Sequence, residues 1–152
     1  MRIRYLPAIA LALGAVTGSA QEIVKVPASQ AGVTLPEDIF GLPPGQWYVA
    51  RQVSQGNNPC TADGCEAGFN SGDLAISVER AKEHVQVIAG FRGCQAVAFQ
   101  EVETGLNPGK SSRGEVSHLL KKVVKAAEKS CKVKAPTVPK LDVASLFPAK
   151  AS

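Results

Sequence analysis

Four cysteines are the residues of this 152-residue chain that could most readily do chemistry. Cys60 and Cys65 stand close together in the stretch NPCTADGCEAG, and Cys94 and Cys131 lie farther along. A C-x4-C spacing suits a zinc ion, but four thiolates would have to meet around it. A thioredoxin-like redox pair requires C-x-x-C and haem attachment requires C-x-x-C-H, and neither motif occurs. The remaining interpretations of the Cys60–Cys65 loop are a structural staple and a binding loop clamped at its neck.

The two histidines offer a second chemistry. If adjacent strands place Phe91 opposite Cys94, His84 faces Glu101, and such a pair could act as acid and base. Cross-strand His–Glu contacts are also common without catalysis. His118 falls on the predicted solvent side of a helix. Because the chain has no G-x-S-x-G, H-E-x-x-H or Gly-rich phosphate-binding motif, we predict no catalytic residue, no metal site and no cofactor.

Lysines are concentrated on one side of the predicted C-terminal helix. Each residue of an α-helix advances ~100° around the axis, so a group of five lysines falls within an arc of about 100°. They are Lys121, Lys122, Lys125, Lys129 and Lys132. This face is either a solvated surface or a patch for an anionic partner such as lipid head groups, polysaccharide or an acidic protein. The candidate partner-binding residues are Lys121, Lys122, Lys125, Lys129 and, in the cysteine loop, Asp63.

The first twenty residues, MRIRYLPAIALALGAVTGSA, predict export. Arg2 and Arg4 precede an apolar run from Leu6 to Val16, and small residues follow at the positions that a signal peptidase reads. The run is shorter than the ~20 residues that a membrane-spanning helix needs. We therefore predict a cleaved signal peptide over 1–20 and a soluble mature protein, periplasmic or secreted, without a transmembrane anchor. A nucleic-acid partner is not expected there.

Charge is divided unevenly along the chain, whose formal net charge is +4. Residues 21–101 carry 5 Lys/Arg and 9 Asp/Glu, whereas residues 102–152 carry 10 and 4. The basic character therefore belongs to the C-terminal part, where the lysine face lies. Aromatic residues make up 5% of the chain, which leaves little material for stacking sugars or bases.

The N-terminal half predicts an arm followed by strands. Residues 21–45 are rich in proline and small residues, and within them Thr34 and Glu37 form a plausible capping box for a helical turn through Phe40. From Gln46 onward the apolar period is two, which is typical of strands. The predicted strands cover 47–53, 73–80, 83–91 and 94–102, with Arg92-Gly93 as a tight hairpin turn.

The C-terminal half predicts one helix and a tail. Ser112 with Glu115 forms a second helix-start signal, and Pro136 ends the helix. Apolar residues between them recur at helical spacing: Val116, Leu119, Leu120, Val123, Ala127 and Cys131. The Pro-rich tail, 136–152, contains an apolar segment from Leu141 to Phe147 that either docks or stays mobile.

These elements together predict an α+β domain over 46–135, an antiparallel meander of about four strands covered by one C-terminal amphipathic helix. In an exported chain, four cysteines indicate two disulfides with three possible pairings. Cys94 belongs to the apolar face of the last strand and Cys131 to the helix stripe that covers it. We therefore predict the pairs Cys94–Cys131 and Cys60–Cys65, because each can approach to bonding distance.

A short Cys-bounded loop between strands is similar to a feature of one class of periplasmic lysozyme inhibitors. The similarity covers Cys60 to Cys65 and the neighbouring strands. Those inhibitors carry a histidine in the loop, whereas this loop reads Thr61-Ala62-Asp63-Gly64, and the C-terminal helix has no counterpart in them. The resemblance implies an inhibitor of a periplasmic or secreted hydrolase such as lysozyme, acting through the clamped loop.

The predicted function is that of an exported small binding or accessory protein that acts through surface patches and not by catalysis. Its partner would be a protein or an anionic component of the cell envelope. Three alternatives remain: the hydrolase inhibitor, a small enzyme that uses His84 and Glu101, and a surface-associated structural protein tethered by a mobile C-terminal tail.

Overall fold

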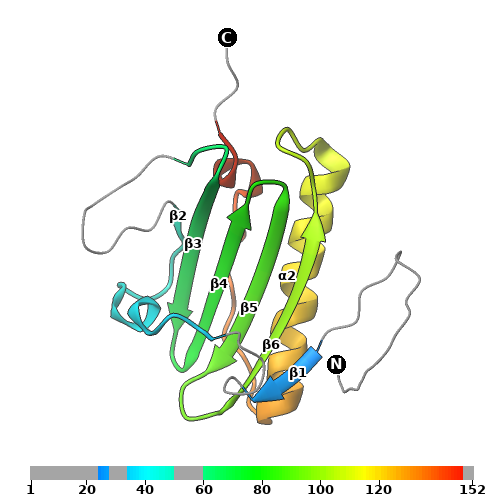
Figure 1. Cartoon of the computed structure of the whole chain (residues 1–152). Coiled ribbons are helices and arrows are strands. Elements are labelled where there is room, and N and C mark those ends of the chain that lie inside the picture. Colours follow the sequence, from blue (N-terminus) through cyan, green and yellow to red (C-terminus); the bar gives the residue numbers. More distant parts are fainter. Residues whose placement is uncertain (1–23, 28–33, 50–59, 149–152) are drawn as a thin grey trace.

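The computed structural model of the chain describes residues 24–27, 34–49 and 60–148. Its centre is a six-stranded antiparallel sheet in the order β1-β6-β5-β4-β3-β2, with one long helix, α2, against one face (Figure 1). The elements are β1 (Val24–Pro27), η1 (Glu37–Gly41), β2 (Tyr48–Val49), β3 (Gly64–Ser71), β4 (Leu74–Ala81), β5 (His84–Phe91), β6 (Ala96–Glu103), α2 (Lys110–Cys131) and η2 (Val143–Leu146), where η marks a 3-10 turn. The predicted fold class, an antiparallel meander covered by a C-terminal amphipathic helix, is confirmed.

The side chains that face α2 form the main core. The predicted apolar stripe of the helix is buried at five of its six positions: Val116, Leu119, Leu120, Val123 and Ala127. Beneath it, alternation along the strands buries a matching set from β4 and β5: Leu74, Ile76, Val78, Val85, Val87 and Ala89. Burying an aliphatic side chain of this size contributes roughly 1.5–3 kcal/mol, so this layer is a large source of hydrophobic stabilisation.

The opposite face of the sheet carries a second, smaller apolar layer. Here η1 packs against β3 and β4, and its Ile39 is fully buried. Asn70 of β3 is buried as well and donates from Nδ2 to the carbonyl oxygens of Ile39 at 2.7 Å and Leu42 at 2.9 Å. The Ile39 carbonyl also accepts from the Leu42 amide at 3.1 Å, so the Asn70 bonds add a link from the turn to β3. The helical turn predicted through Phe40 is thus anchored to the sheet.

The hairpin between β5 and β6 differs from the predicted register by two residues. Gly93 has φ +85°, the Cys94 amide donates to the Phe91 carbonyl at 3.0 Å, and β6 begins only at Ala96. Cys94 therefore belongs to the turn and not to the strand. A shift of two residues leaves every side chain on its predicted face, because side chains alternate with period two.

Both predicted capping boxes are wrong, although both helical segments exist. The residue before η1 is Pro36 and the residue before α2 is Gly109, and neither makes a side-chain capping bond. Ser112 lies inside the first turn of α2. The helix ends at Cys131 because Lys132 adopts a left-handed conformation, φ 55°, several residues before Pro136.

Two short strands in the N-terminal part of the chain extend the sheet. Residues 24–27, predicted as part of an arm, form β1 and pair with β6, Val24 opposite Phe99. Of the strand predicted over 47–53, the structure forms β2 at Tyr48–Val49, and 50–53 lie outside the described residues.

The C-terminal tail docks as far as residue 148. Trp47 donates from Nε1 to the Pro139 carbonyl at 2.8 Å. Beyond it a group of apolar side chains joins the main core: Leu141, Val143, Leu146 and Phe147. Of the two outcomes left open by the sequence, docking is the one observed.

The predicted signal peptide, 1–20, lies outside the described residues. Within the residues that are described, no helix has the length and apolar character needed to cross a membrane.

Candidate functional site

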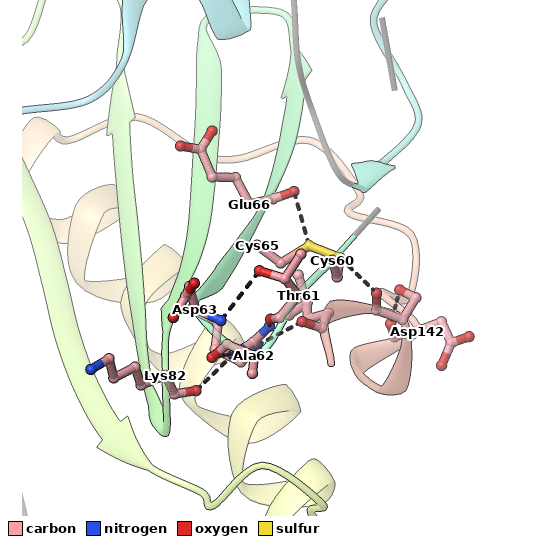
Figure 2. The surroundings of a disulfide bond; sticks show 11 residues. Cys60, Thr61, Ala62, Asp63, Cys65, Glu66, Lys82 and Asp142 are labelled. Carbon is pink, nitrogen blue, oxygen red and sulfur yellow. Dashed lines mark hydrogen bonds between the residues drawn. A yellow bond between two sulfur atoms is a disulfide. The ribbon is translucent and has the colours of Figure 1, made fainter. Parts of the chain in front are cut away.

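Both predicted disulfides are present. Cys94–Cys131 joins the turn before β6 to the last residue of α2, with Cα atoms 6.0 Å apart. Cys60–Cys65 closes the loop that leads into β3, with Cα atoms 4.8 Å apart (Figure 2). The described part of the chain contains no group of three or more His, Cys, Asp or Glu residues placed to hold a metal ion. All four cysteines are paired in these two disulfides.

The Cys60–Cys65 loop rests on a buried arginine that the sequence analysis missed. Arg80 of β4 is 2% exposed and lies on the core face beneath the loop. Its Nη1 donates to the carbonyls of Lys82 at 2.8 Å and Ala62 at 3.4 Å, and its Nη2 donates to that of Thr61. Nε donates to the Leu146 carbonyl at 2.7 Å.

No carboxylate takes part in these four bonds, so backbone carbonyl dipoles balance the buried charge. The guanidinium also lies over the Phe147 ring, 5.0 Å from its centroid, which adds a cation–π contact. Burial lowers the pKa of Arg80 from its ordinary value, because desolvation disfavours the charged form. Arginine still remains protonated, since its ordinary pKa is far above neutrality. The signal for this residue was present in the sequence: Arg80 follows Leu74, Ile76 and Val78 at the same strand period.

The loop above Arg80 is held by its own hydrogen bonds. The Thr61 amide donates to the Gly64 carbonyl at 3.2 Å, and the Asp63 amide donates to Thr61 Oγ1 at 3.2 Å. The Asp63 carbonyl accepts from the Lys82 amide at 3.1 Å, which ties the loop to the β4–β5 turn (Figure 2). Side chains of Thr61, Ala62 and Asp63 are all exposed. The result is a short, internally braced loop that presents Asp63 to solvent. Its predicted role as a partner-binding residue stays a prediction.

His84 and Glu101 are not opposite each other. The register pairs His84 with Glu103, and Glu101 with Gln86, because the turn is two residues longer than predicted. His84 is exposed and borders a hollow of about 340 Å³ that Asp63, Lys82 and Glu83 also line. The acid–base pair on which the enzyme alternative depended is therefore not assembled across the hairpin.

The lysine face of α2 is exposed as predicted. The side chains concerned all reach solvent: His118, Lys121, Lys122, Lys125, Lys129 and Lys132. Towards the C-terminal end of the helix, the face continues into a hollow of about 510 Å³. We call this surface the Val133 patch; its lining residues are Lys125, Glu128, Lys129, Lys132, Val133 and Lys134.

The Val133 patch combines charge with an exposed apolar side chain. Val133 is the large hydrophobic residue that stands exposed, at 42%, among residues 34–49 and 60–148. Glu128 is the acidic residue in the patch, and its Oε2 accepts a hydrogen bond of 2.6 Å from the Ala135 amide. Sequence reasoning found the lysines from their helical spacing. It missed Val133 and Lys134, because the helix was predicted to continue to Pro136 whereas α2 ends at Cys131.

A further hollow lies on the other side of the molecule, between η1 and the β5–β6 turn. Its volume is about 880 Å³, and Arg92 at its edge stacks over the Phe40 ring at 4.3 Å from the centroid. Sequence analysis gave no signal for it. Its lining mixes an apolar wall with Glu37 and Arg92, which have opposite charges, so the surface favours neither sign of ligand.

Comparison of the chain with known protein families, with curated proteins and with solved structures finds no match. The function is therefore inferred from the geometry of these surfaces.

Proposed function

We propose that the protein is an exported, non-enzymatic binding protein that engages an anionic partner through the lysine face of α2. One observation carries the proposal: Lys121, Lys122, Lys125 and Lys129 are all exposed, on the face turned away from the buried stripe. A cluster of like charges on one face raises the local concentration of an anionic partner and its association rate. The face is presented on a helix fixed to the sheet by its buried stripe and by the Cys94–Cys131 disulfide.

The charge arrangement supports this reading over that of a merely solvated face. Like charges spaced three or four residues apart on a helix repel one another and lower its stability. Lys121 and Lys125 stand in this relation, and so do Lys125 and Lys129. A face that served only for solubility would gain from interspersed acidic residues. The concentration of positive charge therefore carries a cost that binding to an anion would offset.

Capture from an envelope extract tests the proposal. The mature protein is immobilised and compared with a variant in which Lys121, Lys122, Lys125 and Lys129 are changed to Ser. A control variant removes the same number of positive charges from exposed sites outside the face, through Lys82→Asn, Arg92→Ser, Lys110→Ser and Lys140→Ser. We expect the first variant to lose an anionic component that wild type and control retain at 0.15 M salt. Equal capture by all three proteins would contradict the proposal.

The braced Cys60–Cys65 loop favours a second candidate, inhibition of a secreted hydrolase through Asp63. A rigid loop loses little conformational entropy on binding, which is why clamped loops are effective inhibitors. The test is inhibition of a panel of lysozymes and other secreted hydrolases by the mature protein. Asp63→Asn should reduce any inhibition, whereas Asp73→Asn, at an exposed turn between β3 and β4, should not. No inhibition across the panel, or equal inhibition by both variants, counts against this candidate.

A further inference from the structure

We propose that the Val133 patch docks the protein on an anionic lipid bilayer, with Val133 entering the interface and the surrounding lysines contacting lipid phosphates. This inference deepens the proposed function and rests on it, since it names the chemical class of the anionic partner.

The composition of the patch is that of an interfacial site. Val133 is exposed at 42%, and Lys129, Lys132 and Lys134 around it are exposed too. An apolar tip among positive charges matches the bilayer boundary, where acyl chains lie directly beneath anionic phosphates. A soluble polyanion would use the lysines alone and would gain nothing from the valine. The pairing of the two features therefore favours a lipid surface over polysaccharide or a free anion.

The backbone of the patch is held in place before any partner arrives. The Val133 amide donates to the Glu128 carbonyl at 3.2 Å, and the Ala135 amide donates to Glu128 Oε2 at 2.6 Å. The disulfide at Cys131, two residues before Val133, links the end of α2 to the β5–β6 turn. Both amides bond to Glu128, so the segment from Val133 to Ala135 is held at the end of α2 while the Val133 side chain stays exposed. Preorganisation of this kind reduces the entropy lost on docking.

Glu128 is the acidic residue of the patch, and lysines outnumber it. Its carboxylate accepts the Ala135 amide at the base of the patch, whereas the lysine side chains reach outwards into solvent. Lys121 and Lys122 extend the same positive strip towards the N-terminus of the helix. Each lysine that reaches an anionic membrane surface strengthens binding by about fivefold at moderate salt. Docking through several of them is therefore reversible and strongly dependent on ionic strength.

Co-sedimentation with defined vesicles tests the inference. The mature, oxidised protein is mixed with vesicles of phosphatidylcholine alone or with about a third phosphatidylglycerol, at low and high salt. We expect binding only to the anionic vesicles, lost as salt rises. The paired change Lys129→Ser with Lys134→Ser should weaken binding roughly 25-fold, since about fivefold is lost per lysine. Val133→Ser should weaken it about threefold to fivefold without altering the salt dependence.

Controls separate the patch from general charge and from folding. The paired change Lys110→Ser with Lys140→Ser removes two exposed charges outside the patch and should leave vesicle binding nearly unchanged. Urea midpoints of all variants should match wild type, because each altered side chain is exposed. Full retention of vesicle binding by Val133→Ser overturns the insertion of Val133. Equal loss in the control pair overturns the assignment of the patch.

Two further probes distinguish failure of this inference from failure of the proposed function. Glycerol phosphate at millimolar concentration should not displace the protein from vesicles, because a single headgroup lacks the array of charges and the apolar layer. Displacement by it would show a site for one phosphate group and overturn docking on a bilayer. If heparin binds through the lysines while anionic vesicles do not, the proposed function stands and the lipid inference fails. If neither heparin nor anionic vesicles bind, and the lysine substitutions leave capture from the extract unchanged, then the proposed function and the lipid inference both fail.

Discussion

Arg80 on β4 donates a hydrogen bond from Nε to the carbonyl oxygen of Leu146, 2.7 Å away across 66 residues of sequence. The remaining nitrogens of the same side chain reach the Cys60–Cys65 loop and the β4–β5 turn. One buried cation therefore connects the cysteine loop, the β4–β5 turn and the C-terminal tail. The loop that presents Asp63 and the docked C-terminal tail consequently depend on each other through Arg80.

Replacing Arg80 with Met should lower the free energy of unfolding by about 3 kcal/mol. Methionine fits the space but donates no hydrogen bond, so buried carbonyls lose a charged donor worth roughly 1.5–3 kcal/mol each, offset partly by the guanidinium's desolvation cost. Urea unfolding measures the loss. Arg92→Met is the control, because Arg92 is exposed and contacts the Phe40 ring. If Arg92→Met lowers the free energy of unfolding as much as Arg80→Met does, the buried hydrogen bonds of Arg80 are not the cause of the loss.

Removing the two disulfides should have unequal effects. Cys94–Cys131 spans 37 residues and Cys60–Cys65 spans 5. In the chain-entropy account a crosslink stabilises by restricting the unfolded chain, which gives ~4 kcal/mol for the longer loop and ~2 kcal/mol for the shorter. Double Cys→Ser variants of each pair, unfolded in urea, test this order. If the variant that lacks Cys60–Cys65 is the less stable of the two, the predicted order is wrong.

Shortening the chain after Lys140 should prevent folding. The truncation removes four buried side chains, Leu141, Val143, Leu146 and Phe147, and leaves Arg80 without its Leu146 acceptor. Each such side chain is worth roughly 1.5–3 kcal/mol, and the sum approaches the whole stability of a small domain. Circular dichroism and thermal unfolding report the outcome. The protein truncated after Pro148 keeps every described contact and should unfold as wild type does. A cooperative unfolding transition in the protein truncated after Lys140 would refute the prediction.

Local patterns predicted the faces of the sheet and helix but not the register. Alternation assigns Val85, Val87 and Ala89 to the core whether the β5–β6 turn has two or four residues, because a shift of two preserves the face. The turn itself depends on Gly93 and on a Cys94 amide that bonds Phe91, neither of which the period reveals. The His84–Glu101 pairing depended on register and was therefore wrong, whereas the disulfide pairing depended on faces and is confirmed.

Contacts between distant segments account for what the sequence did not predict. The acceptors of Arg80 are backbone carbonyls, which every residue has, so nothing in their side chains marks them. Docking of the tail likewise depends on core side chains that only the assembled sheet and helix bring together. The lysine face was predictable because helical spacing is local. Val133 was not, since its position depends on the left-handed turn at Lys132.

Adding a methyl group at two glycines should change stability in opposite directions. At Gly64, beside the cysteine loop, a Cβ would lie 2.9 Å from the Arg80 carbonyl oxygen, a backbone atom that cannot move without disturbing β4. Gly64→Ala should therefore destabilise the protein by about 1–3 kcal/mol. At Gly114, inside α2, a Cβ meets no atom within 4 Å, and alanine favours the helix by roughly 1 kcal/mol over glycine.

Urea unfolding of both variants gives the sign and size of each change. Gly41→Ala supplies the neutral reference, because a Cβ there also meets no atom within 4 Å and the residue is not inside a long helix. If Gly64→Ala were as stable as Gly41→Ala, the backbone at Gly64 would be able to move away from the Arg80 carbonyl oxygen at little cost. The loop would then be free to shift, and the rigid presentation of Asp63 that supports inhibition would lose its basis.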